Sequence, residues 1–209
     1  MKVAVLGGTG SFGRALATRL VALGEDEVVI GSRDAARAEE TARELGGATT
    51  GATNEDAVQG ADLVVLAVKA DGALDTARAV ATALGDTPLL SVASAIEFRK
   101  GVGAFPDPEA RSLAERIQDV VKAPVVAGLH SIAAASLDRE PPEEDALICG
   151  DDADAKELAL ALASKLVAGR ALDAGPLASA RALEGVTAVI VNLNRRYKAH
   201  AGIRVTGLE

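Results

Sequence analysis

The sequence predicts an α/β protein with a doubly wound, Rossmann-type parallel sheet. The first observation is that residues 1 to about 130 alternate between short apolar runs and amphipathic helical patterns, which is typical of a parallel sheet covered by helices on both faces. The second is a G-x-G-x-x-G, formed by Gly8, Gly10 and Gly13, between the first apolar run and the first helical pattern. In this strand–turn–helix context the motif predicts a dinucleotide site.

Apolar runs and end signals place the elements of this part. Gly24, Gly46 and Gly85 follow helical patterns and are typical helix ends. Asp34 and Thr53 precede helical patterns and are expected to cap them. Strands are expected at residues 2–6, 27–30, about 49, 62–68, 89–92 and 125–129, and helices at 11–23, 34–45, briefly from 53–56, 74–84 and 109–121.

The segment 94–108 interrupts the alternation. It contains two glycines and two prolines, and we expect a long loop over the carboxyl edge of the sheet, where open α/β sheets bind ligands.

The last third of the chain predicts a polar loop and a few further elements. The loop is expected from Arg139 to Asp145, strands at 146–149 and 171–173, and helices at 155–167 and about 177–200. Acidic residues at 151, 152 and 154 precede one of these helices. Helix capping is therefore preferred to a metal site for them.

The residues after the second strand indicate which dinucleotide is bound. A fold that binds NAD usually has an acid there, which accepts hydrogen bonds from the ribose hydroxyls. This chain has Gly31, Ser32 and Arg33 instead. A hydroxyl and a guanidinium suit an added 2′-phosphate, so the sequence predicts a site for NADP.

Composition excludes several other classes of function. The formal net charge is −8, and the aromatic residues are three Phe and one Tyr with no Trp, which argues against a nucleic-acid partner. One cysteine and two histidines cannot form a conventional metal cluster. No apolar run is long enough to span a membrane, and the first residues read as a strand rather than a signal peptide. We therefore expect a cytoplasmic protein.

At this level of detail the chain resembles the NADP oxidoreductases that use the 8-hydroxy-5-deazaflavin coenzyme F-420, nearly end to end. The resemblance lies in short blocks of sequence. These are Leu6 to Gly10 with Gly13, Gly31 to Arg33 with Arg37, Asp75 to Arg78, Leu129 to Ile132, Cys149 to Asp152, and Leu172 to Leu177 followed by Ala180, Arg181 and Glu184.

The resemblance implies site residues, an activity and an assembly. NADP contacts would fall on Gly8, Thr9, Gly10, Ser11, Phe12 and Gly13 in the glycine loop, on Ser32, Arg33 and Arg37 around the 2′-phosphate, and on Val68 and Ala93 after two strands. His130 and Ile132 would lie beside the deazaflavin ring, with His130 as a ring contact rather than an acid or base. It also implies a homodimer, an NADP-binding domain at 1–144, and a small C-terminal domain at 145–209 that completes the acceptor site and the dimer interface.

The expected reaction is hydride transfer between NADP(H) and the deazaflavin. The rings carry the chemistry and the protein holds them face to face, which agrees with the lack of a catalytic triad or paired carboxylates. The chain departs from the family pattern at Lys69-Ala70 and at Ala133. Two alternatives therefore stay open: a reductase of another acceptor, such as a flavin, a pterin or a small ketone or imine, and an NADP-binding module without turnover.

Overall fold

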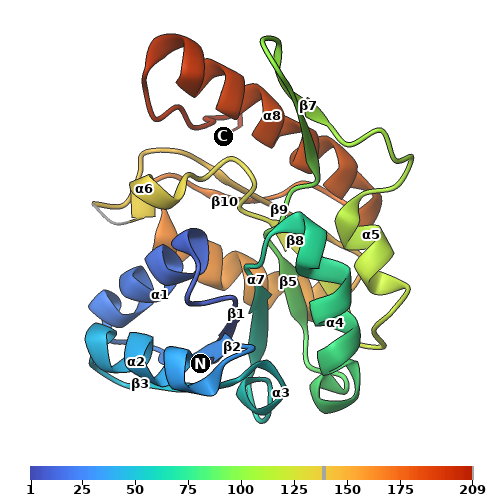
Figure 1. Cartoon of the computed structure of the whole chain (residues 1–209). Coiled ribbons are helices and arrows are strands. Elements are labelled where there is room, and N and C mark those ends of the chain that lie inside the picture. The colour runs from blue at the N-terminus through green and yellow to red at the C-terminus, as the bar shows by residue number, and fades with distance from the viewer. Residues whose placement is uncertain (138–139, 209) are drawn as a thin grey trace.

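The computed structural model describes residues 1–137 and 140–208, and within them one eight-stranded sheet and a separate two-stranded hairpin account for all strands (Figure 1). The strands are β1 (Lys2–Leu6), β2 (Glu27–Ser32), β3 (Thr49–Thr53), β4 (Leu63–Leu66), β5 (Leu89–Ser91), β6 (Ile96–Arg99), β7 (Gly103–Pro106), β8 (Val125–Gly128), β9 (Ala146–Gly150) and β10 (Ala171–Asp173). The helices are α1 (Ser11–Leu23), α2 (Ala35–Leu45), α3 (Asn54–Ala57), α4 (Ala70–Leu84), α5 (Leu113–Gln118), α6 (Ala134–Leu137), α7 (Ala153–Leu166), the 3-10 turn η1 (Leu177–Ser179) and α8 (Ala180–Tyr197).

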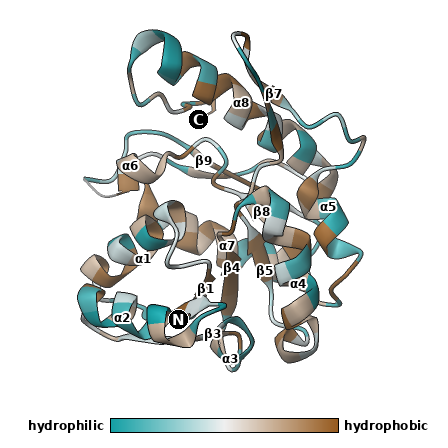
Figure 2. Cartoon of the chain, viewed as in Figure 1, coloured by the Kyte–Doolittle hydropathy of each residue, from teal (hydrophilic) through white to brown (hydrophobic). Residues whose placement is uncertain are grey.

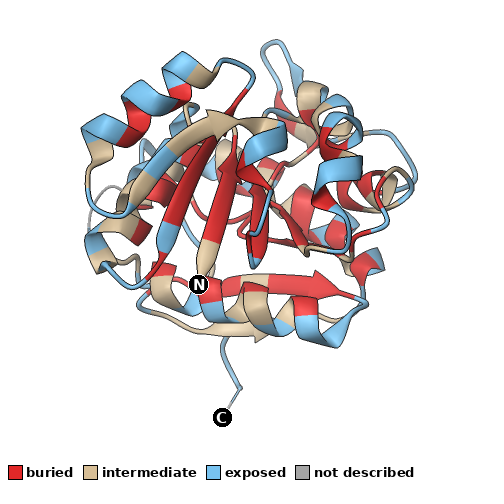
Figure 3. Cartoon of the chain, turned by 90° about the horizontal axis from the view of Figure 1, so that it is seen from below, coloured by how far each residue is buried: buried red, intermediate tan, exposed pale blue. Residues whose placement is uncertain are grey.

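The large sheet has the order β10-β9-β8-β5-β4-β1-β2-β3. All neighbouring pairs are parallel except β8 and β9. Along β1 the side chains alternate, so that Val3 and Val5 join one apolar cluster and Ala4 and Leu6 the other. Helices α1, α2, α6 and α7 cover the face that carries Val3 and Val5, and α3, α4 and α5 cover the face that carries Ala4 and Leu6. The inner strands of the large sheet are accordingly mostly brown in Figure 2 and mostly red, meaning buried, in Figure 3, whereas the edge strands β3 and β10 are only partly buried. The predicted fold class is confirmed.

The predicted end of α1 and the predicted caps of α2 and α3 are confirmed. Helix α1 has the predicted bounds, and Gly24 ends it in the left-handed conformation (φ 68°). The Asp34 side chain caps α2 by accepting from the Arg37 backbone N–H at 3.3 Å. The Thr53 side chain caps α3 by accepting from the Asp56 backbone N–H at 3.1 Å. The prediction for α4 was wrong at its start, because the helix already begins at Ala70.

Helix α5 is shorter than the predicted helix 109–121. Ser112 accepts from the Glu115 backbone N–H at 3.1 Å, and the Glu115 carboxylate accepts from the Ser112 backbone N–H at 2.7 Å. This capping box fixes the start of the helix at Leu113.

The predicted long loop 94–108 is wrong in part, because it contains the antiparallel hairpin β6–β7. The hairpin lies along α8 (Figure 1). Asn192 of α8 completes its backbone hydrogen bonding: the Ala104 N–H donates to Asn192 Oδ1 at 2.8 Å, and Asn192 Nδ2 donates to the Ala104 carbonyl at 2.7 Å. A helix side chain thus fixes this ribbon, and a partner 88 residues away leaves no local sequence signal.

The C-terminal third continues the same sheet through β9 and β10. The division at 144/145 stays a prediction. Strand β9, which begins just after that point, pairs antiparallel with β8. Asp152 caps α7 by accepting from the Ala155 N–H at 2.8 Å, as predicted. Asp151 accepts from the Leu177 N–H at 2.9 Å and thereby joins the two blocks that precede α7 and α8.

Helix α8 ends at Tyr197 rather than near residue 200, because Lys198 takes a left-handed conformation (φ 51°). The predicted loop from Arg139 to Asp145 begins outside the described residues. Over the described ranges, no helix has the length and apolar character needed to cross a membrane.

Candidate functional site

The carboxyl ends of five adjacent parallel strands form one edge of the large sheet. Taken in the sheet order β8, β5, β4, β1 and β2, they lead to His130, Ala93, Val68, Gly8 and Ser32. Since neighbouring strands are about 4.8 Å apart, this edge extends over roughly 19 Å. The strand order reverses between β1 and β4, which is where open α/β sheets bind dinucleotides. The structure therefore brings the sequence-predicted site residues to one edge.

The glycine loop is a tight backbone turn at the centre of this edge. Gly7 has φ 79°, and its N–H donates to the Gly31 carbonyl at 3.0 Å. A Cβ on Gly13 would lie 2.5 Å from the Gly7 carbonyl oxygen, so only glycine lets α1 approach the turn this closely. On its other side the turn contacts Val68, whose Cγ1 would lie 2.7 Å from a Cβ on Gly7.

The first turn of α1 is suited to bind an anion. Gly10 provides no side-chain cap, and the first turn holds no acidic residue. The positive end of the helix dipole and the free N–H groups of the first turn thus face the glycine loop. Thr9 and Phe12 are half-buried and Ser11 is exposed. Phe12 packs against the apolar cluster that includes Ile132, so its ring has a structural role as well.

The end of β2 combines a buried hydroxyl with two exposed cations. Ser32 is buried, and its Oγ accepts from the Asp34 N–H at 3.2 Å. Arg33 and Arg37 are exposed, and neither forms an ion pair within the described part of the chain. Asp34, the acid next to Arg33 in the chain, is occupied in capping α2. The arrangement favours a phosphate over a pair of ribose hydroxyls.

His130 occupies the other end of the edge and is buried, with 7% of its surface exposed. The Gly128 and Ala93 carbonyls lie near the ring, but neither completes a hydrogen bond, and both ring nitrogens lack a partner among the described residues. Burial lowers the pKa of His130 to about 4, so the imidazole is neutral at neutral pH. An unpartnered buried polar ring is costly, and such a ring at a sheet edge is a candidate ligand contact.

The backbone before His130 is unusual. Leu129 has φ 63°, a left-handed conformation that a buried leucine rarely takes. Strained residues of this kind cluster at functional sites. Its carbonyl accepts from the Ile132 N–H at 3.1 Å, which closes a tight turn around His130. Ile132 is 5% exposed and packs in the cluster below α1 and α6.

Sequence reasoning missed Thr187, which connects α8 to this site. Its hydroxyl donates to the His130 carbonyl at 2.8 Å. Thr187 Oγ1 and Ser94 Oγ are 2.7 Å apart, and because the Thr187 proton is already used, Ser94 is the donor. The only available signal was a single polar residue within the apolar stretch of a helix.

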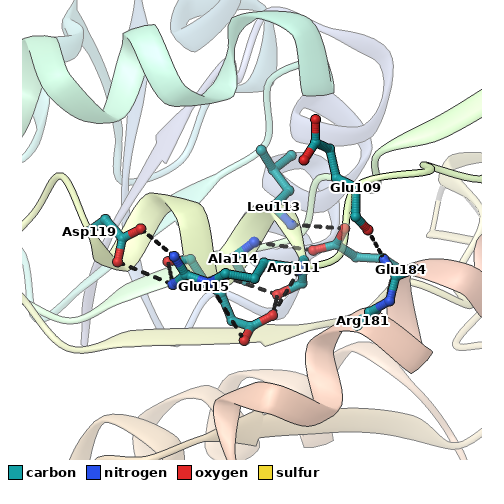
Figure 4. A network of polar contacts seen from close by, with 9 residues as sticks. Glu109, Arg111, Leu113, Ala114, Glu115, Asp119, Arg181 and Glu184 are labelled. Atoms are coloured by element: carbon teal, nitrogen blue, oxygen red, sulfur yellow. Dashed lines mark hydrogen bonds and ion pairs between the residues drawn. The ribbon is translucent and has the colours of Figure 1, made fainter.

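Glu184, one turn earlier on α8, holds the same helix against α5 (Figure 4). Its buried carboxylate accepts from the Leu113 and Ala114 N–H groups, both at 3.1 Å. Burial raises the pKa of Glu184, and the two amides at the start of α5 oppose that shift. Arg181 donates to the Glu109 carbonyl, as Figure 4 also shows. Arg111 and Asp119 form an ion pair of 2.6 Å on the outer side of α5.

Comparison with known proteins agrees with this geometry. Residues 2–95 match the family model described as NADP oxidoreductase, coenzyme F420-dependent. The F420-dependent NADP reductase of Methanothermobacter thermautotrophicus is 38% identical over 100% of this chain and 96% of its own length. That of Methanocaldococcus jannaschii is 32% identical over 100% of both chains.

A solved structure from an Arthrobacter species, attributed to an F420-dependent NADP reductase, has a TM-score of 0.87 at 28% identity. It covers 99% of this chain and 100% of that chain. Together with the full-length relatives, this places the chain in the family of coenzyme F420-dependent NADP oxidoreductases.

Proposed function

We propose that this chain catalyses hydride transfer between NADP(H) and the deazaflavin coenzyme F420. The observation that carries the proposal is the single sheet edge. Its β1–β2 end has the geometry of a phosphate-binding dinucleotide site, and its β8 end holds a buried, neutral imidazole that has no hydrogen-bond partner in the described part of the chain. The activity is the one named for the full-length relatives.

The residues present fit NADP. The pyrophosphate would lie against the α1 N-terminus, where Gly8, Gly10 and Gly13 keep the backbone open to close approach. Arg33 and Arg37 would pair with the 2′-phosphate, with the Ser32 hydroxyl beside them. Val68 and Ala93 follow β4 and β5, between this region and His130, and would contact the rest of the dinucleotide.

The residues at the β8 end fit a flat ring with polar edge groups. When bound, the two rings supply the hydride chemistry. His130 is neutral, so one ring nitrogen donates and the other accepts. It would donate a hydrogen bond to a ring carbonyl and would not transfer a proton itself. Ile132 fixes the turn that holds His130, and Thr187 ties that turn to α8.

Rapid-mixing absorbance spectroscopy tests the proposal. The purified chain is mixed with NADPH and F420, and we expect the deazaflavin band to bleach together with the nicotinamide band. NADPH oxidation with a flavin, pterin, ketone or imine but not with F420 would favour the first alternative. Tight NADPH binding without oxidation by any of these would favour a binding module.

We also propose that the protein is a homodimer in the cytoplasm. Val189, Leu193 and Tyr197 follow one another at four-residue spacing on α8 and are exposed, and Phe98 and Val102 are exposed on the adjacent hairpin. Such an apolar stripe beside an apolar ribbon is typical of a protein interface. Light scattering should give a mass of two chains for the wild-type protein and of one chain for Leu193→Arg. A wild-type monomer would refute the assembly.

A further inference from the structure

The last residues form a strap, defined here as residues 199–208, that returns from the end of α8 to the start of β9. The Asp145 N–H donates to the Ile203 carbonyl at 2.7 Å, and the Val205 N–H donates to Asp145 Oδ2 at 2.9 Å. Arg170 donates to the carbonyls of Val205 and Leu208. At its other end, the Ala201 N–H donates to Asn194 Oδ1 at 2.6 Å, so the strap is tied to the last turns of α8.

Glu144 lies directly beneath this strap. It is 6% exposed, and its Oε2 has no hydrogen-bond partner within the described residues. A Cβ on Gly202 would lie 1.9 Å from that oxygen, so the strap backbone rests on the carboxyl group at a residue without a side chain. The carboxyl group also lines a surface cavity of about 240 Å³, whose other walls include Ser136, His200, Ile203 and Arg204.

The charged groups around Glu144 interact with partners other than Glu144. On its own segment, Asp145 pairs with Arg170 at 2.7 Å, and this arginine and its backbone amide hold the pKa of Asp145 well below its usual range. Glu143 pairs loosely with Arg204 of the strap at 3.8 Å, and His200 is an exposed wall of the cavity. No cation within the described residues pairs with Glu144. Burial raises its pKa to about 7, although the Ile203 N–H of the strap acts in the opposite direction.

We propose that Glu144 is a proton-operated latch for the strap. While its carboxyl group is neutral, Gly202 packs on it and the strap stays docked on β9. When the proton leaves, a buried carboxylate with no cationic partner among the described residues remains, and the nearby Ile203 N–H offsets its desolvation cost only in part. The carboxylate regains water only when Gly202 and its neighbours lift away. Release therefore accompanies a rise in pH, and it frees the chain that follows the last turns of α8.

Hydrogen exchange of the intact protein, followed by mass spectrometry of peptides that cover the strap, tests the latch. We expect strap protection to fall as pH rises from about 5 to 7, by up to about tenfold per pH unit, because this interval lies between the ordinary glutamate pKa of 4.5 and the pKa of about 7 in the docked state; above that pKa protection should level off. The comparison at each pH is with Glu144→Gln, which keeps the shape and cannot ionise, so intrinsic exchange cancels. This variant should keep the strap protected throughout.

Three matched variants complete the test. Glu143→Gln removes an exposed neighbouring charge and should keep the wild-type pH dependence. His200→Gln removes the imidazole that lines the cavity and should also keep it. Gly202→Ala should release the strap at every pH, because its Cβ meets the carboxyl group. The proposal is overturned if wild-type strap protection does not change with pH, or if Glu144→Gln shows the same change as wild type. None of these readouts depends on hydride transfer.

Discussion

The sheet edge that forms the candidate site has two ends, one at β1–β2 and one at β8, and they are built in different ways. At the β1–β2 end, the groups proposed to bind NADP lie mostly within residues 7–37, and backbone contacts such as Gly7 N–H to Gly31 carbonyl hold them. At the β8 end, Ser94, His130 and Thr187 come from three distant parts of the chain and meet through side-chain hydroxyls. The first end is a local backbone structure, and the second exists only once the tertiary fold is complete.

The two ends also differ in how they use polarity. The β1–β2 end, proposed here to bind NADP, presents exposed cations and helix N–H groups, which suit a charged and hydrated phosphate. The β8 end buries a neutral imidazole whose two nitrogens have no hydrogen-bond partner among the residues that the structure describes. Changes at one end should therefore affect one substrate and leave the other nearly unaffected.

The largest effect is expected from Gly13→Ala. The new Cβ would lie 2.5 Å from the Gly7 carbonyl oxygen and would push α1 off the glycine loop. We expect the protein to lose about 2 to 3 kcal/mol of stability and NADPH affinity to fall at least about a hundredfold, because the α1 N-terminus moves. Gly72→Ala is the matched control, since no atom of the described residues lies within 4 Å of a Cβ placed there. Urea unfolding and a fluorescence titration with NADPH measure both, and equal behaviour of the two variants would contradict the prediction.

The next effect belongs to the β8 end and concerns acid stability. The pKa of His130 falls from 6.5 in the unfolded chain to about 4 in the fold. The unfolded chain therefore takes up a proton first as pH drops, and stability that is full above pH 6.5 declines towards pH 4. At about 1.4 kcal/mol per pKa unit, the loss approaches about 3 kcal/mol. His130→Asn should flatten this part of the curve in urea unfolding at several pH values. An unchanged slope would show that other groups cause it.

The difference between the two ends also explains what the sequence could predict. Helix α1, its end at Gly24 and the Asp34 cap depend on neighbours in the chain, so their signals are local. The hairpin β6–β7 depends on Asn192, and the start of α5 depends in part on Glu184, both of them tens of residues away. His130 was indicated by family resemblance, but its burial follows from packing that no local pattern encodes.

At the NADP end, Arg33→Ala should weaken NADPH binding by about 2 kcal/mol, or roughly thirtyfold, because a charge-assisted pair with the 2′-phosphate is lost. Binding of NADH, which lacks that phosphate, should hardly change. Arg43→Ala removes an exposed arginine from the far end of α2 and serves as the control. Calorimetric titration with both nucleotides measures the difference. Equal losses for NADPH and NADH would contradict the assignment of Arg33 to the phosphate.

The smallest effect tests whether the β8 end depends on α8. Thr187→Val keeps the volume of the side chain but removes the hydroxyl that links Ser94 to the His130 carbonyl. One such link contributes about 1 kcal/mol, so we expect KM for F420 to rise about fivefold while the NADPH Kd stays the same. Thr187→Ser keeps the hydroxyl and should restore KM. If Val and Ser behave alike, α8 is held by packing and by Glu184 alone. If both substrates weaken together, the two ends of the edge are not independent, because His130 and the glycine loop would then share the α1–α6 packing as a common support.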